Sequence, residues 1–287
     1  MNNPFSLPLR LIFTDLDGSL LDHHSYSFKP AIELLKTLEV EGIPVIPVTS
    51  KTMAELVPLR KKLANQHPFI IENGAAICIP KGYFSRQPET AKIVEDFWVI
   101  ENADYRQNWL ELLEKNSQEF LDEYQTFDSI YKQQGDEGIA ELTGLSSTAA
   151  GLANNRQYSE PVHWTGTAPR KRLFISKMQT AGATVLQGGR FLSIGDNTDK
   201  GLALLQLQDL YLQQSGQTSC QSLAIGDSGN DISMLEKASS ALIIKSNNHP
   251  APTLTRSHNL WISKKTGPTG WASGVADWLQ IHSCKTR

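Results

Sequence analysis

The chain has 287 residues, of which 40% are hydrophobic and 20% charged, so we expect an ordinary globular fold of one large or two modest domains. The formal net charge of −3 gives no electrostatic reason to expect nucleic acid or an anionic membrane surface as a partner. The three cysteines are widely separated and form no CxxC pair, which indicates neither a thiolate zinc site nor a disulfide framework.

The first ninety residues alternate short apolar runs with helical patterns. The predicted elements are a strand at 11–13, a helix at 29–38, a strand at 43–48, a helix at 51–65 and a strand at 69–71. Pro44 and Pro47 favour an edge or an irregular geometry for the second strand, and Pro58 predicts a kink or a late start in the second helix. This alternation is typical of a parallel sheet with right-handed crossovers.

The pattern changes after about Ser85. Helical stretches at 103–120 and 168–181 flank a polar region at 124–160, and we expect an inserted domain of ferredoxin-like character. The α/β pattern returns at Gly188, with further elements predicted at 191–194, 199–205, 223–226, 232–237, 241–245 and 272–280. The predicted organisation is a discontinuous core, 1–86 and 191–287, interrupted by a second domain at 87–190.

Acidic residues follow two of the predicted core strands. Asp15 and Asp17 follow the first strand, and Asp227 and Asp231 follow the strand at 223–226. Strand-end loops of parallel sheets are where α/β proteins bind ligands, and crowded carboxylates repel each other unless a cation or a proton intervenes. An EF-hand loop is excluded, because that motif needs glycine at its sixth position and Gly18 is fourth.

The expected charge balance of these loops points to phosphate chemistry. Four aspartates, Asp15, Asp17, Asp227 and Asp231, would meet with Lys200 as the clear cation. A divalent metal makes such a cluster tolerable, and a phosphate that bridges the metal and the lysine makes it useful. Asp15 can then act as a nucleophile and Asp17 as an acid/base.

Four motifs together resemble the haloacid dehalogenase superfamily of phosphatases. They are Asp15-Leu-Asp-Gly-Ser19, Thr49 after the second strand, Lys200, and Gly226-Asp-Ser-Gly-Asn-Asp231. The resemblance implies a haloacid dehalogenase-like Rossmannoid core, α/β in class, with an inserted α+β cap of the C2 type. Only about thirty residues separate Asp17 from Thr49, so the cap is expected between the second and third motifs.

Narrower strings resemble the mannosyl-3-phosphoglycerate phosphatase family. They are Thr49-Ser-Lys-Thr-Met-Ala-Glu55, Gln187-Gly-Gly-Arg-Phe-Leu192, Asp199-Lys-Gly201 and Gly267-Pro-Thr-Gly-Trp271. One departure is that relatives tend to carry an arginine after the tryptophan that matches Trp164, whereas this chain has Thr165. If that arginine touches the substrate, this chain's substrate differs.

The resemblance implies roles for the motif residues. Asp15 would form an aspartyl-phosphate, Asp17 would be the acid/base, and Thr49 and Lys200 would hold the phosphoryl oxygens. Mg²⁺ would be the cofactor. Its ligands would be Asp15, the carbonyl of Asp17, Asp227 and, through water, Asp231, and Asp231 has the alternatives of holding Lys200 or capping a helix.

Four further residues are candidates for substrate binding. Ser50 offers hydroxyl and backbone donors, Asn73 follows the third strand, and Asn230 lies in the last acidic loop. Arg190 is a candidate ligand for a substrate carboxylate, with a surface salt bridge as the alternative. Asn73 has the alternative of a turn residue, and Asn230 that of ordering its loop.

The expected function is Mg²⁺-dependent removal of phosphate from mannosyl- or glucosyl-3-phosphoglycerate, which yields a glycosylglycerate of the compatible-solute type. The alternatives are a broader sugar-phosphate phosphatase, a phosphomannomutase-like phosphotransferase, and a non-catalytic phosphosugar-binding protein. No stretch resembles a signal peptide or a membrane span, so we expect a cytoplasmic monomer or homodimer.

Overall fold

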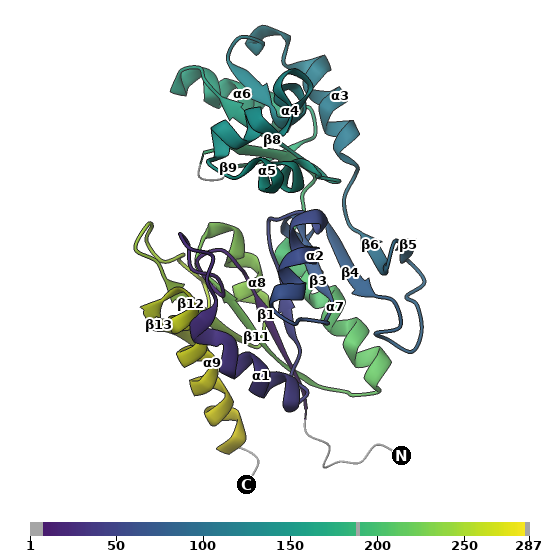
Figure 1. Cartoon of the computed structure of the whole chain (residues 1–287), viewed down its shortest axis with the longest axis vertical. Coiled ribbons are helices and arrows are strands. Elements are labelled where there is room, and N and C mark those ends of the chain that lie inside the picture. The colour runs from purple at the N-terminus through teal and green to yellow at the C-terminus, as the bar shows by residue number, and fades with distance from the viewer. Residues whose placement is uncertain (1–7, 188–189, 285–287) are drawn as a thin grey trace. The chain divides into compact units, whose positions relative to one another are not determined.

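The computed structural model describes residues 8–187 and 190–284 and divides into two compact units (Figure 1). The first unit comprises Met1–Thr49, Gln66–Ile100 and Asp199–Arg287, and the second comprises Ser50–Asn65 and Glu101–Thr198. These bounds differ from the expected insertion at 87–190, because residues 87–100 fall in the first unit, and Ser50–Asn65 and residues 191–198 fall in the second. No helix among the described residues is long and apolar enough to cross a membrane.

The first unit is built mainly of strands and helices that alternate along the chain. Its strands are β1 (Leu9–Thr14), β2 (Val45–Pro47), β3 (Phe69–Ile71), β4 (Ala76–Pro80), β5 (Lys92–Val94), β6 (Phe97–Glu101), β11 (Cys220–Gly226), β12 (Ser240–Lys245) and β13 (Leu260–Thr266). Its helices are α1 (Ile32–Val40), α7 (Lys200–Ser215), α8 (Ile232–Lys237) and α9 (Gly267–Cys284), with short 3₁₀ turns η1 (Lys29–Ala31), η2 (Glu72–Gly74) and η4 (Gly229–Asp231).

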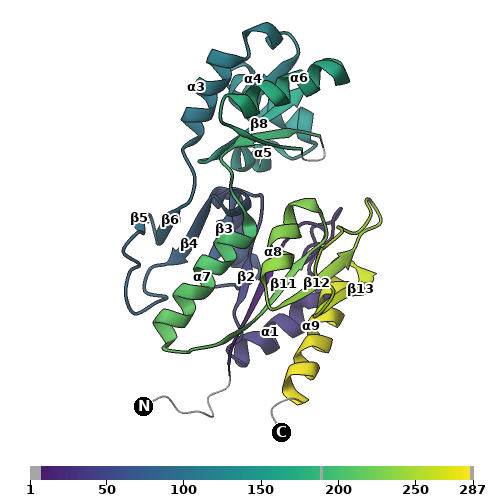
Figure 2. The same cartoon turned by 180° about the vertical axis from the view of Figure 1, so that it is seen from behind.

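Five strands of the first unit form a parallel sheet in the order β13-β12-β11-β1-β2. Leu11 and Phe13 of β1 face the cluster that α7 and α8 cover, and Ala224 and Ile243 belong to the same cluster. Figures 1 and 2 show α1 and α9 on one face of this sheet and α7 and α8 on the other. Because all five strands run the same way, their carboxyl ends lie at one edge.

The strand β3 corrects one sequence prediction. We expected Phe69–Ile71 as a regular strand of the parallel sheet, but a single parallel bridge, Val48 with Ile70, links it to the end of β2. Its regular ladder is antiparallel to β4, in a second sheet of order β3-β4-β6-β5. The edge position predicted for the proline-containing strand is confirmed, since β2 ends the five-stranded sheet.

The second unit is an α+β structure. Its strands are β7 (Tyr124–Thr126), β8 (Ser159–Trp164), β9 (Thr184–Gln187) and β10 (Leu192–Gly195), and they form an antiparallel sheet in the order β7-β8-β10-β9. Its helices are α2 (Met53–Lys62), α3 (Arg106–Asn116), α4 (Phe127–Thr143), α5 (Ser147–Asn154) and α6 (Ala168–Thr180), with the 3₁₀ turn η3 (Gln118–Phe120). Its main core is a cluster of Trp109, Leu113, Phe120, Val162, Phe174, Met178, Ala183, Leu192 and Ile194.

Two other expectations need correction. The strand predicted at 191–194 exists as β10, but it pairs antiparallel with β8 and β9 instead of joining the core sheet, because a short apolar run does not specify its partner strands. The helix α2 begins at Met53, where a complete capping box of Thr52 and Glu55 stabilises its first turn, and it continues through Pro58. Gly188 and Gly189, part of one family-like string, lie outside the described residues.

Candidate active site

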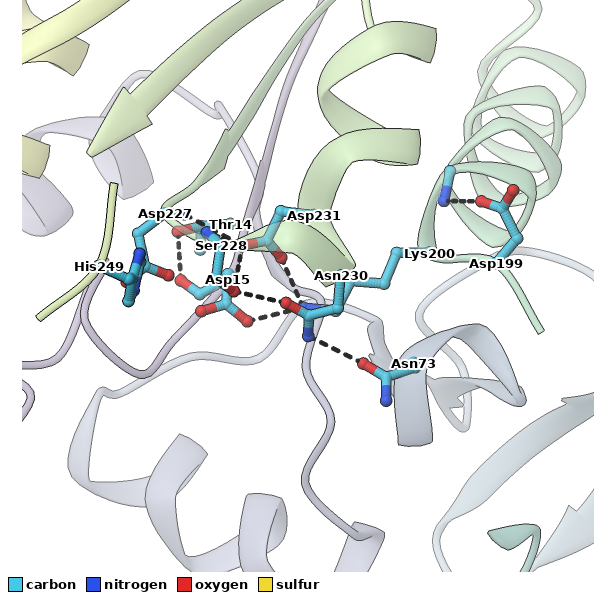
Figure 3. Close-up of polar contacts among 11 residues, drawn as sticks. Thr14, Asp15, Asn73, Asp199, Lys200, Asp227, Ser228, Asn230, Asp231 and His249 are labelled. Atoms are coloured by element: carbon cyan, nitrogen blue, oxygen red, sulfur yellow. Dashed lines mark hydrogen bonds and ion pairs between the residues drawn. The ribbon is translucent and has the colours of Figure 1, made fainter. Parts of the chain in front are cut away.

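The site is built where β1 and β11 end side by side. Asp15 is the first residue after β1, and its N–H donates to the carbonyl of Ile225 on β11 at 2.8 Å. Asp227 follows β11 directly. The parallel register of these two strands therefore places both carboxylates at the same edge of the sheet (Figure 3).

Lys200 joins two of the acids. Its Nζ donates to Asp15 Oδ1 and to Asp231 Oδ1, both at 2.7 Å, and its side chain is 0% exposed. The lysine is the first residue of α7, whose N-terminus is capped by Asp199 through the N–H groups of Gly201 and Leu202, at 2.6 and 3.0 Å. The helix start therefore fixes the base of the lysine and the two carboxylates fix its charged end.

The ionisation of this pair follows from burial and charge. Burial raises the pKa of Asp15 well above its usual value, while the Lys200 charge lowers it and the Asp231 charge raises it. Burial alone would lower the pKa of Lys200, but the Asp15 and Asp231 carboxylates outweigh it and raise that pKa. We therefore treat Lys200 as charged at neutral pH.

Three acids form a group that can hold a metal ion. Asp15, Asp227 and Asp231 each offer a carboxylate oxygen, and these oxygens lie within 4.8 Å of one another. Burial raises the pKa of Asp227 to about 6, and the Asp231 charge adds to the effect. Buried carboxylate oxygens in such proximity are the ligands that hard divalent cations prefer, so the residues present fit the expected ion.

The predicted ligand set is brought together only in part. The side chain of Asp17 is not a member of the acidic group, and the sequence analysis had expected its backbone carbonyl to serve. Asp231 is already well occupied, because Oδ1 accepts from Lys200 and Oδ2 accepts from the N–H groups of Asp227 and Ser228, both at 3.0 Å. Of the three roles left open for Asp231, holding Lys200 is present. Asp231 is the N-cap residue of α8 but makes no side-chain capping bond there, and its carboxylate instead closes a capping box with Ser228 at η4.

A glycine lets the first acidic turn approach the second. Gly18 has φ of +82°, and a Cβ built there would lie 2.5 Å from Asp227 Oδ2. Both the backbone conformation and the lack of space exclude a side chain. Gly18 therefore allows the loop that follows Asp15 to lie against Asp227.

Thr49 and Asn73 meet at a strained turn. Thr49 is buried, its N–H donates to Ile70 at 3.0 Å, and its carbonyl accepts from the N–H of Asn73 at 2.9 Å. Glu72 and Asn73 have φ of +45° and +60°, a region that costs non-glycine residues energy and that clusters at functional sites. The strained turn thus fixes the backbone of the loop that carries Thr49.

The same turn is tied to two other loops. Asn230 Nδ2 donates to Asn73 Oδ1 at 3.1 Å, as Figure 3 shows. A Cβ at Gly74 would lie 2.6 Å from the carbonyl oxygen of Asp199, so this turn lies directly against the start of α7. The structure therefore brings Thr49, Asn73 and Asn230 into one hydrogen-bonded arrangement with the base of Lys200 close by.

The remaining two predicted residues belong to the second unit. Ser50 is exposed, and its carbonyl accepts from Arg156 Nη2 at 3.0 Å. Arg190 is exposed; its Nη1 donates to the carbonyl of Leu142 at 3.0 Å and its Nη2 to that of Thr143. Arg190 therefore contacts the C-terminal carbonyls of α4, and its binding of a substrate carboxylate stays a prediction.

Sequence analysis missed two residues that contact the site. His249 Nε2 lies 3.2 Å from Asp227 Oδ2, and nothing in its surrounding residues signals this contact. Trp271 is fully buried, and its Nε1 donates to Thr14 Oγ1 at 3.0 Å, directly beside Asp15. Trp271 did stand in a family-like string, but that string indicated no role.

Comparison with known proteins identifies the family. A relative from Methanococcoides burtonii named glucosyl-3-phosphoglycerate/mannosyl-3-phosphoglycerate phosphatase is 34% identical over 276 residues, 93% of this chain and 96% of the relative. A relative of the same name from Persephonella marina is 35% identical over 238 residues, 82% of this chain and 84% of the relative. The family description haloacid dehalogenase-like hydrolase matches residues 12–137. The chain belongs to the haloacid dehalogenase-like hydrolases.

Solved structures agree on the fold of this hydrolase. A phosphatase of the haloalkanoate enzyme superfamily from Bacteroides thetaiotaomicron has a TM-score of 0.66 at 16% identity and covers 99% of this chain and 98% of its own. The sucrose-phosphatase from Synechocystis sp. PCC6803 has a TM-score of 0.56 at 15% identity, with 95% and 98% covered. The family and the α/β fold with a parallel core sheet, both expected from the motifs, are confirmed.

Proposed function

We propose that this hydrolase is a Mg²⁺-dependent phosphomonoesterase that removes the phosphate from glucosyl- or mannosyl-3-phosphoglycerate. The observation that carries the proposal is the identity of 34% over 93% of the chain to a phosphatase named for both substrates. The buried contact between Lys200 and Asp15 supports the chemistry, because a held lysine beside a carboxylate suits the binding and attack of a phosphoryl group.

The proposed reaction has two steps. An oxygen of Asp15 attacks phosphorus, the bond from phosphorus to the 3-oxygen of the glycerate breaks, and Asp17 donates a proton to that oxygen. Asp17 then takes a proton from water, the water oxygen attacks phosphorus, and the bond from phosphorus to Asp15 breaks to release phosphate. Lys200 and Thr49 hold the non-bridging oxygens through both steps.

The proposed ligands of the Mg²⁺ ion are Asp15, Asp227, the carbonyl of Asp17 and, through water, Asp231. The ion, when bound, supplies positive charge to the phosphoryl oxygens. The buried oxygens of Asp15, Asp227 and Asp231, within 4.8 Å of one another, support this assignment. Their burial also means that a cation relieves repulsion that water cannot screen.

The sugar and glycerate parts of the substrate need contacts beyond the phosphate. We propose that these contacts are made by Ser50, Asn73, Asn230 and Arg190. We also propose that the chain divides into a catalytic core and a cap that sets substrate specificity. Asn73 and Asn230 support the proposal best, because the bond between their amides and the bond from Ser228 Oγ to Asn230 Oδ1 at 2.6 Å fix both side chains near the base of Lys200. We further propose that the enzyme acts in the cytoplasm, as a monomer or homodimer, in making a compatible solute.

Phosphate release from a substrate panel tests the proposal. The panel holds mannosyl- and glucosyl-3-phosphoglycerate, 3-phosphoglycerate, mannose phosphates and a nucleotide, each with Mg²⁺ or with EDTA. We expect metal-dependent turnover of the two glycosyl-phosphoglycerates and loss of at least about 10³-fold in Asp15→Asn, because the amide is no nucleophile. Turnover spread over simple sugar phosphates contradicts the substrate, and full activity of Asp15→Asn contradicts the mechanism.

The phosphotransferase alternative has its own signature in this assay. A phosphomannomutase-like enzyme needs a bisphosphorylated activator and hydrolyses simple esters poorly. Adding a hexose bisphosphate to the panel therefore separates the two functions, because only the phosphotransferase then converts one hexose phosphate isomer into the other.

A further inference from the structure

A chain of two buried hydrogen bonds links the last helix to the residue proposed as nucleophile. The indole Nε1–H of Trp271 donates to Thr14 Oγ1 at 3.0 Å, and the Thr14 hydroxyl donates to the carbonyl of Asp15 at 2.7 Å. Trp271 and Thr14 are both 0% exposed. Both bonds are therefore shielded from water, where a lost partner costs about 1–3 kcal/mol.

The hydrogen bond from Thr14 holds a backbone group of Asp15 that lies just beyond the end of β1. Asp15 lies one residue beyond β1, and its N–H is still held by Ile225 on the neighbouring strand at 2.8 Å. Its carbonyl is bonded instead by the Thr14 hydroxyl. With its N–H and C=O both bonded, the backbone that carries the Asp15 carboxylate has little freedom to rotate.

The indole decides which way the hydroxyl points. A threonine hydroxyl has one hydrogen and two acceptor lone pairs, and its hydrogen rotates to suit its surroundings. Because Trp271 Nε1 can only donate, it requires an acceptor lone pair on its side and leaves the hydroxyl hydrogen for the Asp15 carbonyl. The indole N–H thus orients a bond that it does not itself form.

The family-like string around Trp271 gains a physical meaning from this contact. The helix α9 starts at Gly267, which has φ of +53°. A Cβ at Gly270 would lie 2.0 Å from the carbonyl oxygen of Lys265 and 2.8 Å from Ser263 Oγ, so only glycine allows the first turn of α9 to lie against the end of β13. The two glycines fold the chain back so that the next residue, Trp271, reaches Thr14.

We infer that Trp271 is a positioning residue for the nucleophile, acting on Asp15 through the hydroxyl of Thr14. This inference rests on the proposed function, in which Asp15 attacks phosphorus. A misplacement of about 1 Å in a reacting group can cost about 10²-fold in rate. The loss of rate should appear in the chemical step rather than in substrate binding, because neither Trp271 nor Thr14 has a charged group that could bind the phosphate.

Trp271→Phe tests the inference, with Trp278→Phe as its matched control. The control removes an indole N–H from a second buried tryptophan of α9. We expect kcat to fall about 10- to 100-fold in Trp271→Phe with KM changed less than about twofold, and kcat to change less than about twofold in Trp278→Phe. Equal kcat values in the two variants overturn the inference.

Variants of Thr14 complete the test. Thr14→Val should lower kcat as Trp271→Phe does, Thr14→Ser should restore most of it, and the double variant Thr14→Val/Trp271→Phe should be no worse than either single variant. Losses in kcat that multiply in the double variant contradict the proposed link from Trp271 through Thr14 to Asp15. An unchanged kcat in Thr14→Val also contradicts it, even if Trp271→Phe folds poorly. Full activity of Asp15→Asn, measured alongside, refutes the proposed function instead.

Discussion

Lys200→Met is the substitution that tests the electrostatics of the site most directly. Methionine keeps the length of the side chain and removes its charge. It leaves the carboxylates of Asp15 and Asp231, each bonded to Nζ at 2.7 Å in the folded protein, without that cation. Because the lysine side chain is 0% exposed, water cannot take its place without rearrangement.

The size of the effect follows from these contacts. A hydrogen bond to a charged group contributes about 1.5–3 kcal/mol, and removal of one partner from a buried ion pair costs about 3–5 kcal/mol. Both lost bonds belong to one buried cation, so we expect the free energy of unfolding to fall by about 3–5 kcal/mol at pH 7.5. Phosphatase activity should be lost as well.

Urea unfolding in EDTA measures this change, with Lys237→Met as the control. Lys237 Nζ contacts Asp199 Oδ2 at 3.1 Å near the same helix start, but its side chain is 31% exposed. A partly exposed pair of this kind contributes about 1 kcal/mol or less, so the same substitution there should have a small effect. The comparison separates the buried charge from the loss of a lysine as such.

The penalty in Lys200→Met should also depend on pH. Asp15 already has a raised pKa in the folded protein, and loss of the lysine, which lowers it, raises it further. As the pH falls through that higher pKa, the carboxyl becomes neutral and the uncompensated charge disappears, so the penalty should shrink between pH 8 and pH 5.5. The contribution of Lys200 itself is constant in this window, which lies far below its unfolded pKa of about 10.4. A penalty below about 1 kcal/mol, or one that does not vary with pH, would refute this account.

Two further predictions concern the metal site. In Gly18→Ala the new Cβ would lie 2.5 Å from Asp227 Oδ2, at a backbone φ of +82°. The free energy of unfolding, measured in urea, should therefore fall by about 1–3 kcal/mol, and activation should require a higher Mg²⁺ concentration. An unchanged Mg²⁺ requirement contradicts this. Because burial raises the pKa of Asp227 to about 6, the carboxyl binds a proton below that pH, and calorimetric Mg²⁺ affinity should drop between pH 7.5 and 5.5; equal affinities contradict the assignment of Asp227 as a ligand.

The sequence predicted that Asp15 and Asp227 lie close together, because their positions follow from one rule. Asp15 and Asp227 each follow a buried strand, and parallel strands end at a common edge, so their proximity needed no knowledge of side-chain contacts. Lys200 was predicted as the cation for a similar reason, since it opens a helix. The partners of each group were not predictable in the same way: Asp231 had three open roles, and its bonds to Lys200 and to the N–H of Asp227 became clear only with the loop geometry.

Arg190 shows which contacts the sequence could not predict. Its guanidinium bonds to Leu142 and Thr143, which lie 48 and 47 residues earlier in the chain, at the end of a helix whose length the sequence did not reveal. The strand that follows it, β10, was predicted as a strand but assigned to the wrong sheet, because periodicity describes one strand's faces and not its neighbours. Pairing and long-range contacts depend on the whole fold.

Trp271 shows the same limit of prediction from sequence, here for a residue in a recognised string. Its string was recognisable because Gly267, Gly270 and Trp271 stand at fixed spacing, and spacing within one element is what a sequence records. Its partner, Thr14, is 257 residues away, and no local pattern connects an indole to one buried hydroxyl. A string that resembles a family's sequence but has no known chemical role is therefore best interpreted as one half of a tertiary contact. Here the other half lies beside the proposed nucleophile, and that position, rather than the string itself, makes a catalytic consequence testable.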